Sequence, residues 1–402
     1  MRHWILISSL MLVIASCTKI DVDEDLPSWE TLQPQTMETS LDRIHIIADP
    51  TRLDDMMRRF NQDIEVSTDV VYYNYKGELL FEKTGNIEIK GAGSAAADMK
   101  PLGITFDTPF NNGSLKVITP QAVAPSDHLE LIQNVRLRNS GQDFGITMLK
   151  DLAYSEFALR AGMDLELKYG KPLHVFINGK YYGLHNIRTE NDRVAISHLL
   201  QTDTSSITRI KMDDSNKNLE YREGDLALAE SLIRAIKNED AYALEQLLDI
   251  DNFLDYIIFE DYVGNIDWPH NNARAYSVNG SKFRFLLYDL DLAAFRTKNP
   301  ILPEMEYKED HISEILQILL EDNPEFEARL HERQEMWYQA FSPELFNSVV
   351  DELADKIDTD IEYLIARRGF PQSTLQWRLN LEQLKRDFER TDHFNRKKYK
   401  LN

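Results

Sequence analysis

The sequence predicts an α+β fold in which strands dominate the first part of the chain and helices the last. Segments rich in β-branched and aromatic residues, punctuated by glycines, fill residues 41 to about 120. Two Asn-Gly pairs, Asn178-Gly179 and Asn279-Gly280, stand between apolar runs and predict hairpins. From about 310 to 402 the apolar residues recur at helical spacing, which predicts a helical tail without strands.

Composition limits the possible classes of protein. The 402 residues include 45 Lys and Arg against 67 Asp and Glu, so the net charge is −22. Hydrophobic residues make up 43% and charged residues 28%, values close to the globular average, which excludes a disordered chain and a multi-span membrane protein. The negative field repels polyanions and excludes nucleic-acid binding as the main task. An anionic ligand therefore needs a local positive site or a metal ion.

Residues 1–17 predict a secretion signal. Arg2 precedes an apolar run of about 12 residues, shorter than the roughly 20 that a spanning helix needs. The run ends on small residues followed by Cys17, which is the single cysteine of the chain. This ending resembles a bacterial lipobox, in which the cysteine is lipidated and becomes the first mature residue. We expect an exported protein held at a bacterial membrane by a lipid anchor alone; the alternative is an ordinary cleaved signal with an incidental thiol.

Residues 18–40 predict an acidic linker. They are polar and contain Pro27 and Pro34, a composition typical of a tether that holds a folded body away from the membrane. Lys19 followed by acidic residues resembles the surface-export signal of Bacteroidetes lipoproteins. The expected location is therefore the cell surface.

The remaining elements follow in order along the chain. Residues 147–162 have a helical period that stops at Gly162. Helical spacing resumes at 224 and continues to 262, and a hairpin over 273–288 follows it. The strands expected before residue 120 are Ile44–Ile47, Val70–Tyr73, Ile87–Ile89 and Ile104–Phe106.

Two polar segments carry candidate chemistry, and the 273–288 hairpin separates them. Asp267 and Asn272 lie five residues apart in NIDWPHNN, and Asp289 and Asp291 follow the second strand of the hairpin. This order matches a phosphotransferase that uses a loop Asp to accept a hydroxyl proton, an Asn five residues later to bind metal, and a second metal-binding Asp. Oxygen ligands of this kind suit Mg²⁺ or Mn²⁺.

These segments resemble the spore coat protein H (CotH) kinase family, an atypical branch of the protein-kinase fold. Members carry a phrase close to NxDWxxNN and a hairpin ending in WDLD or YDLD, and here NIDWPHNN and YDLDLAAF stand in that order. Upstream landmarks also match in order, namely the NGKYYG hairpin, Arg138-Asn139 with Asp143, and a Gly/Ser loop followed by Lys100. The resemblance implies a kinase-like domain over 41–300, strand-rich to about 190 and mixed after it, with a helical extension over 301–402. The implied fold is therefore a two-lobed, kinase-like member of the α+β class.

The resemblance also implies roles for individual residues. Asp267 becomes the catalytic base, and Asn272 and Asp289 the metal ligands. Lys100 neutralises the nucleotide phosphates under a loop formed by Gly91, Gly93 and Ser94, and Glu156 of the 147–162 helix is the partner of that lysine. The implied cofactors are ATP with Mg²⁺ or Mn²⁺.

Some positions depart from the family pattern. The loop reads KGAGSAAA where members more often have RGNSS, and Pro101 replaces a second lysine. After the NGKYYG hairpin, Ile187-Arg188-Thr189-Glu190 stands where Leu-Arg-Glu is common, so either Glu190 takes the acidic role one residue late or that role is lost. Asp291 and Arg188 are expected to hold the site residues in place without binding the metal or the nucleotide themselves.

Two functions remain open at this point. The first is a metal-dependent transfer from ATP to a hydroxyl of a protein or another acceptor, by phosphoryl or nucleotidyl transfer. The second is a catalytically inactive surface lipoprotein that binds a glycan or a protein, with Trp268, Tyr181 and Tyr182 as candidate aromatic contacts. A hydrolase using His270 beside Asp267 is disfavoured, because no Ser or Cys nucleophile motif accompanies it.

Overall fold

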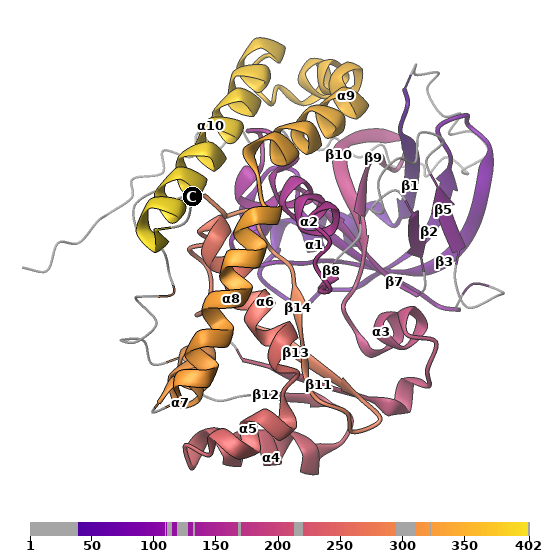
Figure 1. Cartoon of the computed structure of the whole chain (residues 1–402). Coiled ribbons are helices and arrows are strands. Elements are labelled where there is room, and N and C mark those ends of the chain that lie inside the picture. Colours follow the sequence, from indigo (N-terminus) through magenta and orange to yellow (C-terminus); the bar gives the residue numbers. More distant parts are fainter. Residues whose placement is uncertain are drawn as a thin grey trace, which may run out of the picture.

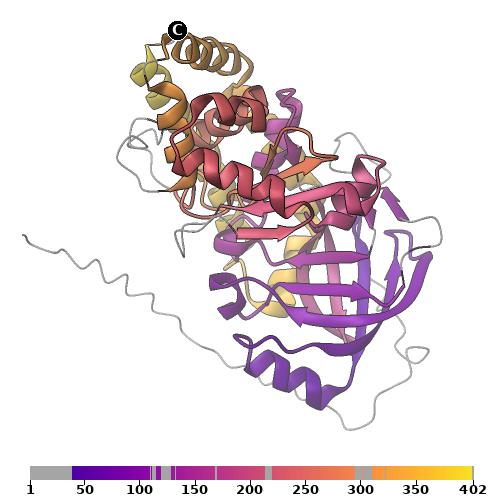
Figure 2. The same cartoon turned by 90° about the horizontal axis from the view of Figure 1, so that it is seen from below.

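The computed structural model describes residues 39–108, 110, 115–118, 128–131, 133–167, 170–212, 220–294, 302, 310–321 and 323–400. The expected signal, Cys17 and nearly all of the expected linker lie outside the described residues. Figures 1 and 2 show a β-barrel beside a larger part built of helices around a small sheet. The predicted α+β class is confirmed. The barrel is closed, and the kinase-like, two-lobed arrangement stays a prediction.

The barrel has seven strands in the order β1-β2-β3-β4-β7-β10-β9. It closes where β1 pairs in parallel with β9, whereas the other neighbours are antiparallel. Alternate residues point inward, as in β2, where Val66 and Val70 are buried on the inner face. All four strands expected before residue 120 are confirmed. The barrel strands are β1 (Asp42–Ala48), β2 (Val66–Tyr73), β3 (Leu79–Ile89), β4 (Leu102–Phe106), β7 (Asn134–Arg138), β9 (Gly170–Ile177) and β10 (Lys180–Thr189).

Helix α1 (Pro50–Arg58) interrupts the region where only strands were expected. The Asp49 side chain accepts from the Arg52 amide, and Pro50 occupies the first turn, where its missing N–H costs nothing. Leu53 and Met56 are buried against the barrel. The helix is short and has few apolar residues, so its helical spacing cannot be recognised between the two flanking strand patterns.

Helix α2 (Lys150–Arg160) confirms the helix expected over 147–162, and it packs against the long helix α9 (Pro343–Arg368), which also contacts β10 of the barrel (Figure 1). Eight of its residues are buried. Asp143 fixes the start of α2, because its carboxylate accepts from the backbone amides of Leu149 and Lys150 at 3.0 and 2.9 Å. A loop from the barrel is thereby tied to a central helix.

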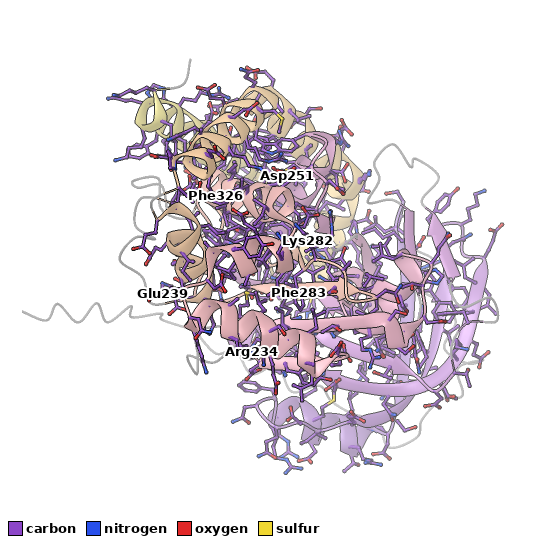
Figure 3. All side chains as sticks on the ribbon, turned by 60° about the horizontal axis from the view of Figure 1, so that its bottom comes forward. Arg234, Glu239, Asp251, Lys282, Phe283 and Phe326 are labelled. Atoms are coloured by element: carbon purple, nitrogen blue, oxygen red, sulfur yellow. The ribbon has the colours of Figure 1, made fainter. Side chains whose placement is uncertain are left out.

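The second sheet has the order β12-β11-β13-β14-β8. Its central hairpin turns at Asn279-Gly280, as predicted, and α6 packs on β14. Figure 3 shows this part with Phe283, next to β14, and Phe326, on α8 (Pro324–Ala340), labelled; both are buried. Its elements are β8 (Glu166–Leu167), α3 (Arg193–Leu199), β11 (Ile207–Lys211), β12 (Glu220–Glu223), α4 (Leu226–Lys237), α5 (Ala241–Leu247), α6 (Ile250–Val263), β13 (Arg274–Val278) and β14 (Arg284–Leu287). A separate pair joins β5 (Leu115–Ile118) to β6 (His128–Leu131).

The predicted helical tail is confirmed over the described residues. It comprises α7 (His311–Leu320), α8 (Pro324–Ala340), α9 and α10 (Thr374–Tyr399). Phe346 and Phe388, from α9 and α10, stack at 4.1 Å and pack with Phe157 of α2. The tail therefore shares the core of the central helices. Within the described part of the chain, none of the helices is long and apolar enough to cross a membrane.

Candidate active site

The loop after α6 carries the candidate base Asp267. Gly264 ends α6 in the left-handed conformation (φ 61°), which glycine adopts without steric cost. The Asp267 carboxylate, half-buried, accepts from Asn272 Nδ2 at 2.9 Å and from Asn271 Nδ2 at 3.1 Å, both on the same oxygen. Trp268 anchors the loop, because its side chain is buried against Tyr256 of α6. The predicted pair of Asp267 and Asn272 is thus in direct contact.

Asn265, the first residue of the NIDWPHNN segment, for which no role was predicted, connects this loop to the end of β14. Its Oδ1 accepts from the Asp267 amide at 3.3 Å. Its Nδ2 donates to Glu260 at 2.9 Å and to the main-chain oxygen of Asp289 at 3.5 Å. Glu260 is fully buried, and burial raises the pKa of its carboxyl to about 8. The carboxyl is therefore neutral at pH 7, and it supports Asn265 without adding charge beneath the loop.

Four elements meet at an acidic cluster, which we define as Asp151, Asp289 and Asp291. The guanidinium of Arg138, at the end of β7, binds Asp289, lies 2.8 Å from Asp291 Oδ2, and approaches Asp151 at 3.1 Å through Nε. Arg188 of β10 also binds Asp151, at 2.9 Å. The structure therefore places Asp289, Asp291 and Arg188, three of the candidate residues, in one network of ion pairs with Arg138 and Asp151.

Burial and neighbouring charges act in opposite directions on the pKa values of Asp291 and Arg138. Burial raises the pKa of Asp291 to about 6, although the charge of Arg138 opposes the shift. For Arg138 itself, burial acts to lower the pKa, but the charges of Asp289, Asp151 and Asp291 outweigh burial and hold it well above its ordinary value. Arg138 is thus a permanent cation among the carboxylates.

Several side-chain oxygens at this site are candidate ligands for a divalent ion. Asn272 and Asp289 offer the hard oxygens that Mg²⁺ and Mn²⁺ prefer. The Asp289 side chain is 28% exposed, whereas those of Asp291 and Asp151 are 8% and 3% exposed. Among the residues that the structure describes, no group of three or more His, Cys, Asp or Glu side chains is placed to hold a metal. Asp289 is thus the carboxylate of this group most open to an ion, and a single carboxylate suits Mg²⁺, which typically binds one or two carboxylates and keeps water and phosphate ligands.

The Gly/Ser loop lies beside this cluster. Asn139, next to Arg138, donates to the main-chain oxygens of Met99 at 2.7 Å and Ser94 at 3.2 Å. Gly91 has φ 88°, in the left-handed region, where a Cβ would also meet the Ser94 side chain. Gly93 and Ser94 belong to a short 3-10 turn, Gly93–Ala96. The loop is therefore held by the same strand end that supplies Arg138.

The Lys100 ammonium contacts its own loop and one aromatic ring outside it. Its ammonium donates to the carbonyl oxygens of Ala95 and Ala97 at 2.8 and 3.3 Å, and it lies 4.2 Å from the ring centre of Phe60. Burial lowers its pKa. Glu156 accepts from Arg160 at 2.8 Å, one helical turn later. Among the described residues, the structure thus shows no contact between Lys100 and Glu156, although the resemblance implies an ion pair between them.

A polar pocket of about 250 Å³ lies between the outer face of the barrel and the second sheet. One row of paired residues crosses the barrel here, running from Glu88 through Gly103 and Arg136 to Arg188. Gly103 leaves room for Lys90, because a Cβ at 103 would lie 2.9 Å from Lys90 Cγ. The polar residues lining the pocket are Glu88, Lys90, Thr105, Asn134, Arg136, Glu190, Asn191, Asp192, Arg209 and Arg274.

Sequence reasoning selected Glu190 and missed the cations of this pocket. Glu190 binds Arg136 at 2.7 Å. Arg136 and Arg138 are two residues apart on β7, so their side chains share one face of the strand. That spacing is the signal that could have pointed to Arg136. Arg209 and Arg274 come from β11 and β13, and their approach to the barrel depends on tertiary structure.

The family model described as "CotH kinase protein" matches residues 87–391. The match begins within β3 and includes the pocket, the acidic cluster and most of the tail, so it extends further toward the C-terminus than the resemblance read from the sequence. A search of curated proteins finds no match.

Proposed function

The chain belongs to the CotH kinase family, and we propose that it is an ATP-dependent and divalent-metal-dependent phosphotransferase acting on a hydroxyl acceptor. The observation that carries the proposal is the linkage of Asp267 to Asp289. Asn265 holds both, through the Asp267 amide and the Asp289 main-chain oxygen. The proposed base and the proposed metal ligand Asp289 are thereby held in fixed positions relative to each other. Phosphoryl transfer depends mainly on such positioning.

Asp267 is proposed as the base. One of its oxygens is occupied by the two asparagine amides, which orient the carboxylate. The acceptor hydroxyl passes its proton to Asp267 as its oxygen bonds to the γ-phosphorus. The bond from that phosphorus to the bridging oxygen breaks, and ADP leaves. Asn271 and Asn272 keep the carboxylate in place during this step.

Asn272 and Asp289 are the residues that would hold the divalent ion. When bound with the nucleotide, the ion neutralises phosphate charge and aligns the transferred group. The chain contributes the fixed positions of the two ligands, because Asn272 is anchored on Asp267 and Asp289 on Arg138.

The polar pocket is proposed to receive the nucleotide phosphates. Arg136 and Lys90 line it, and Arg136 lies on the strand face that leads to Arg138 and the acidic cluster. This supports giving the phosphate-neutralising role to Arg136 and Lys90, while Lys100 stabilises the Gly/Ser loop through its carbonyls. A protein of net charge −22 needs such a local positive site to hold a polyanion.

Labelled nucleotides test the reaction. With Mg²⁺ or Mn²⁺, γ-labelled ATP should transfer label to a hydroxyl acceptor such as casein or the chain itself, and α-labelled ATP should not. Transfer of the α-label would indicate nucleotidyl transfer instead. Arg136→Ala should raise the KM for ATP about tenfold or more, whereas Arg329→Ala, a matched loss of charge on the exposed face of α8, should leave it unchanged. Equal KM values for both variants would remove the pocket from the proposal.

The contacts of Lys100 and Glu156 favour a second candidate, a catalytically inactive member that binds a partner protein or glycan. Each of these residues is engaged locally rather than with the other. Trp268 and Tyr182 are buried, so they form no exposed platform for a sugar. Thermal melting separates the candidates, because a ligand that binds the native state raises the midpoint. A metal-dependent shift with ATP supports the enzyme, and a shift with glycan alone supports the binding protein.

We further propose that Cys17 carries a lipid anchor and that the domain faces the cell exterior, on the lipobox and the acidic residues after it. Metabolic labelling with a fatty acid tests the anchor. The wild type should incorporate label, and Cys17→Ala should not. Protease treatment of intact cells tests the surface location, since an exposed domain is digested while an internal control protein survives.

A further inference from the structure

The acidic cluster is held together by ion pairs within the protein. Asp151, Asp289 and Asp291 meet two guanidiniums, those of Arg138 and Arg188. Burying charges without partners is costly, and Arg138 contacts all three carboxylates. A fixed cation of the protein thus occupies the centre of a group of carboxylates at the candidate metal site.

Asp291 is enclosed by the protein. Its Oδ2 accepts from Arg138 at 2.8 Å and from the Gln142 amide at 2.9 Å. Gly141 packs so closely that a Cβ there would overlap the same oxygen. The Asp291 side chain is 8% exposed. This carboxylate has its ligands from the chain itself and little room for a hydrated ion.

Asp289 differs from Asp291 in its access to solvent. Its backbone is left-handed (φ 66°), and its side chain is 28% exposed. Arg138 binds one of its oxygens, Oδ1. The guanidinium therefore fixes the carboxylate while leaving part of it accessible from outside the cluster.

We propose that Arg138 is a positioning residue that takes the place of a second divalent cation, so that the site binds a single ion through Asp289 while Asp291 is neutralised by the protein alone. This inference rests on the proposed metal-dependent function. Its physical basis is that a guanidinium, which stays charged at any working pH, neutralises carboxylates without needing an ion from solution. Arg138 also orients Asp289. One of its nitrogens binds both Asp289 and the enclosed Asp291, so the fixed position of Asp291 determines where the nitrogen holds Asp289.

Mn²⁺ binding to the full chain, followed by calorimetry and by the electron paramagnetic resonance of free Mn²⁺, tests this inference without any turnover. The wild type should bind one Mn²⁺. Arg138→Gln should bind two, because three carboxylates lose a shared cation. Two control variants should each bind one Mn²⁺. Arg138→Lys keeps the positive charge at position 138, and Arg136→Gln removes a positive charge from the same strand outside the acidic cluster.

Two further variants keep the test decisive if Arg138→Gln fails to fold. Asp289→Asn should weaken Mn²⁺ binding at least tenfold, and Asp291→Asn should change it less than threefold. Two ions on the wild type, one on a folded Arg138→Gln, or a tenfold loss in Asp291→Asn would each overturn the role of Arg138. A wild type that binds no Mn²⁺ would overturn the proposed metal site and this inference together, whereas the other outcomes leave the proposed function standing.

Discussion

Asn272 donates its side-chain amide to Asp267 over 2.9 Å, and this contact sets the direction of both side chains. An ionised carboxylate only accepts hydrogen bonds, so the amide nitrogen of Asn272 faces Asp267 and its oxygen is turned away. The left-handed backbone of Asn272 (φ 63°) allows this orientation directly before the buried residue Ala273. One residue therefore orients the candidate base while its own side-chain oxygen faces away from it.

Replacing Asn272 by glycine should separate metal binding from folding. Glycine adopts the left-handed conformation freely, so Asn272→Gly should keep the stability within about 1 kcal/mol while Mn²⁺ affinity falls at least tenfold. Asn272→Ala should lose the same affinity and, in addition, about 1–2 kcal/mol of stability from backbone strain. Calorimetry with Mn²⁺ and urea unfolding measure the two effects. Unchanged affinity in both variants would exclude Asn272 as a ligand.

Asp267→Asn should abolish most of the transfer activity without unfolding the protein. Removing a general base typically costs 10²- to 10⁴-fold in rate, and we expect a loss in that range in kcat for label transfer from ATP. Asp267 is half-buried, so the melting temperature should change by only a few degrees. His270→Ala, an exposed position in the same loop, should retain activity. If Asp267→Asn were as active as His270→Ala, Asp267 would be excluded as the general base.

Gly141→Ala should destabilise the protein more than Gly162→Ala. Both glycines are left-handed, with φ of 59° and 88°, so each substitution costs about 1–2 kcal/mol of backbone strain. At 141 the new methyl group also overlaps the Asp291 carboxylate, whereas at 162 no atom lies within 4 Å. Overpacking adds about 1–3 kcal/mol. Urea unfolding of the two variants should show this difference, and equal losses would contradict the close packing of Gly141 on Asp291.

Glu260 should make stability fall as pH rises from 6.5 to 8. Its folded pKa, raised to about 8 by burial, exceeds the unfolded value, so the folded state holds a proton that the unfolded state has released. The stabilisation is fully present below the unfolded pKa and is lost as pH rises toward 8, by up to about 1.4 kcal/mol per pH unit.

The comparison with Glu260→Gln isolates this carboxyl from other shifted groups. Burial lowers the pKa of His45 and of His185 to about 4, below the unfolded value of about 6.5, so both make stability rise with pH near 6.5. Asp291, with its pKa raised to about 6, adds a fall there, and all three contributions are the same in both proteins. Urea unfolding at pH 6.5, 7.2 and 8 should show a downward slope in the wild type and a flatter one in Glu260→Gln. The same slope in both proteins would show that Glu260 is ionised when folded.

Local patterns predicted most of the elements. Both Asn-Gly turns form, because the dipeptide itself adopts the left-handed backbone that a two-residue hairpin requires. The helix that ends near Gly162 also forms as predicted. Helix α1 was missed, since only two of its residues, Leu53 and Met56, are buried and the flanking strand patterns mask them.

The site was only partly predictable. Asp267 and Asn272 are five residues apart, and their contact follows from one loop. Arg138 lies about 150 residues before Asp289 in the chain, and no local pattern links the two. The cations of the pocket come from the barrel and from β11 and β13, so only the packing of the two parts places them together.

By itself, the sequence determined the α+β class, the hairpins, the helical tail and the spacing of Asp267, Asn272 and Asp289, because these features depend on neighbouring residues and on family motifs. Tertiary structure alone decided which cation meets which carboxylate. Arg138, rather than Lys100, lies among the acidic residues. The fold brings the end of β7, a barrel strand, to the residues that follow β14 in the second sheet, while the carbonyls of its own loop retain Lys100. Charge pairing across such distances is set by the fold, and composition cannot reveal it.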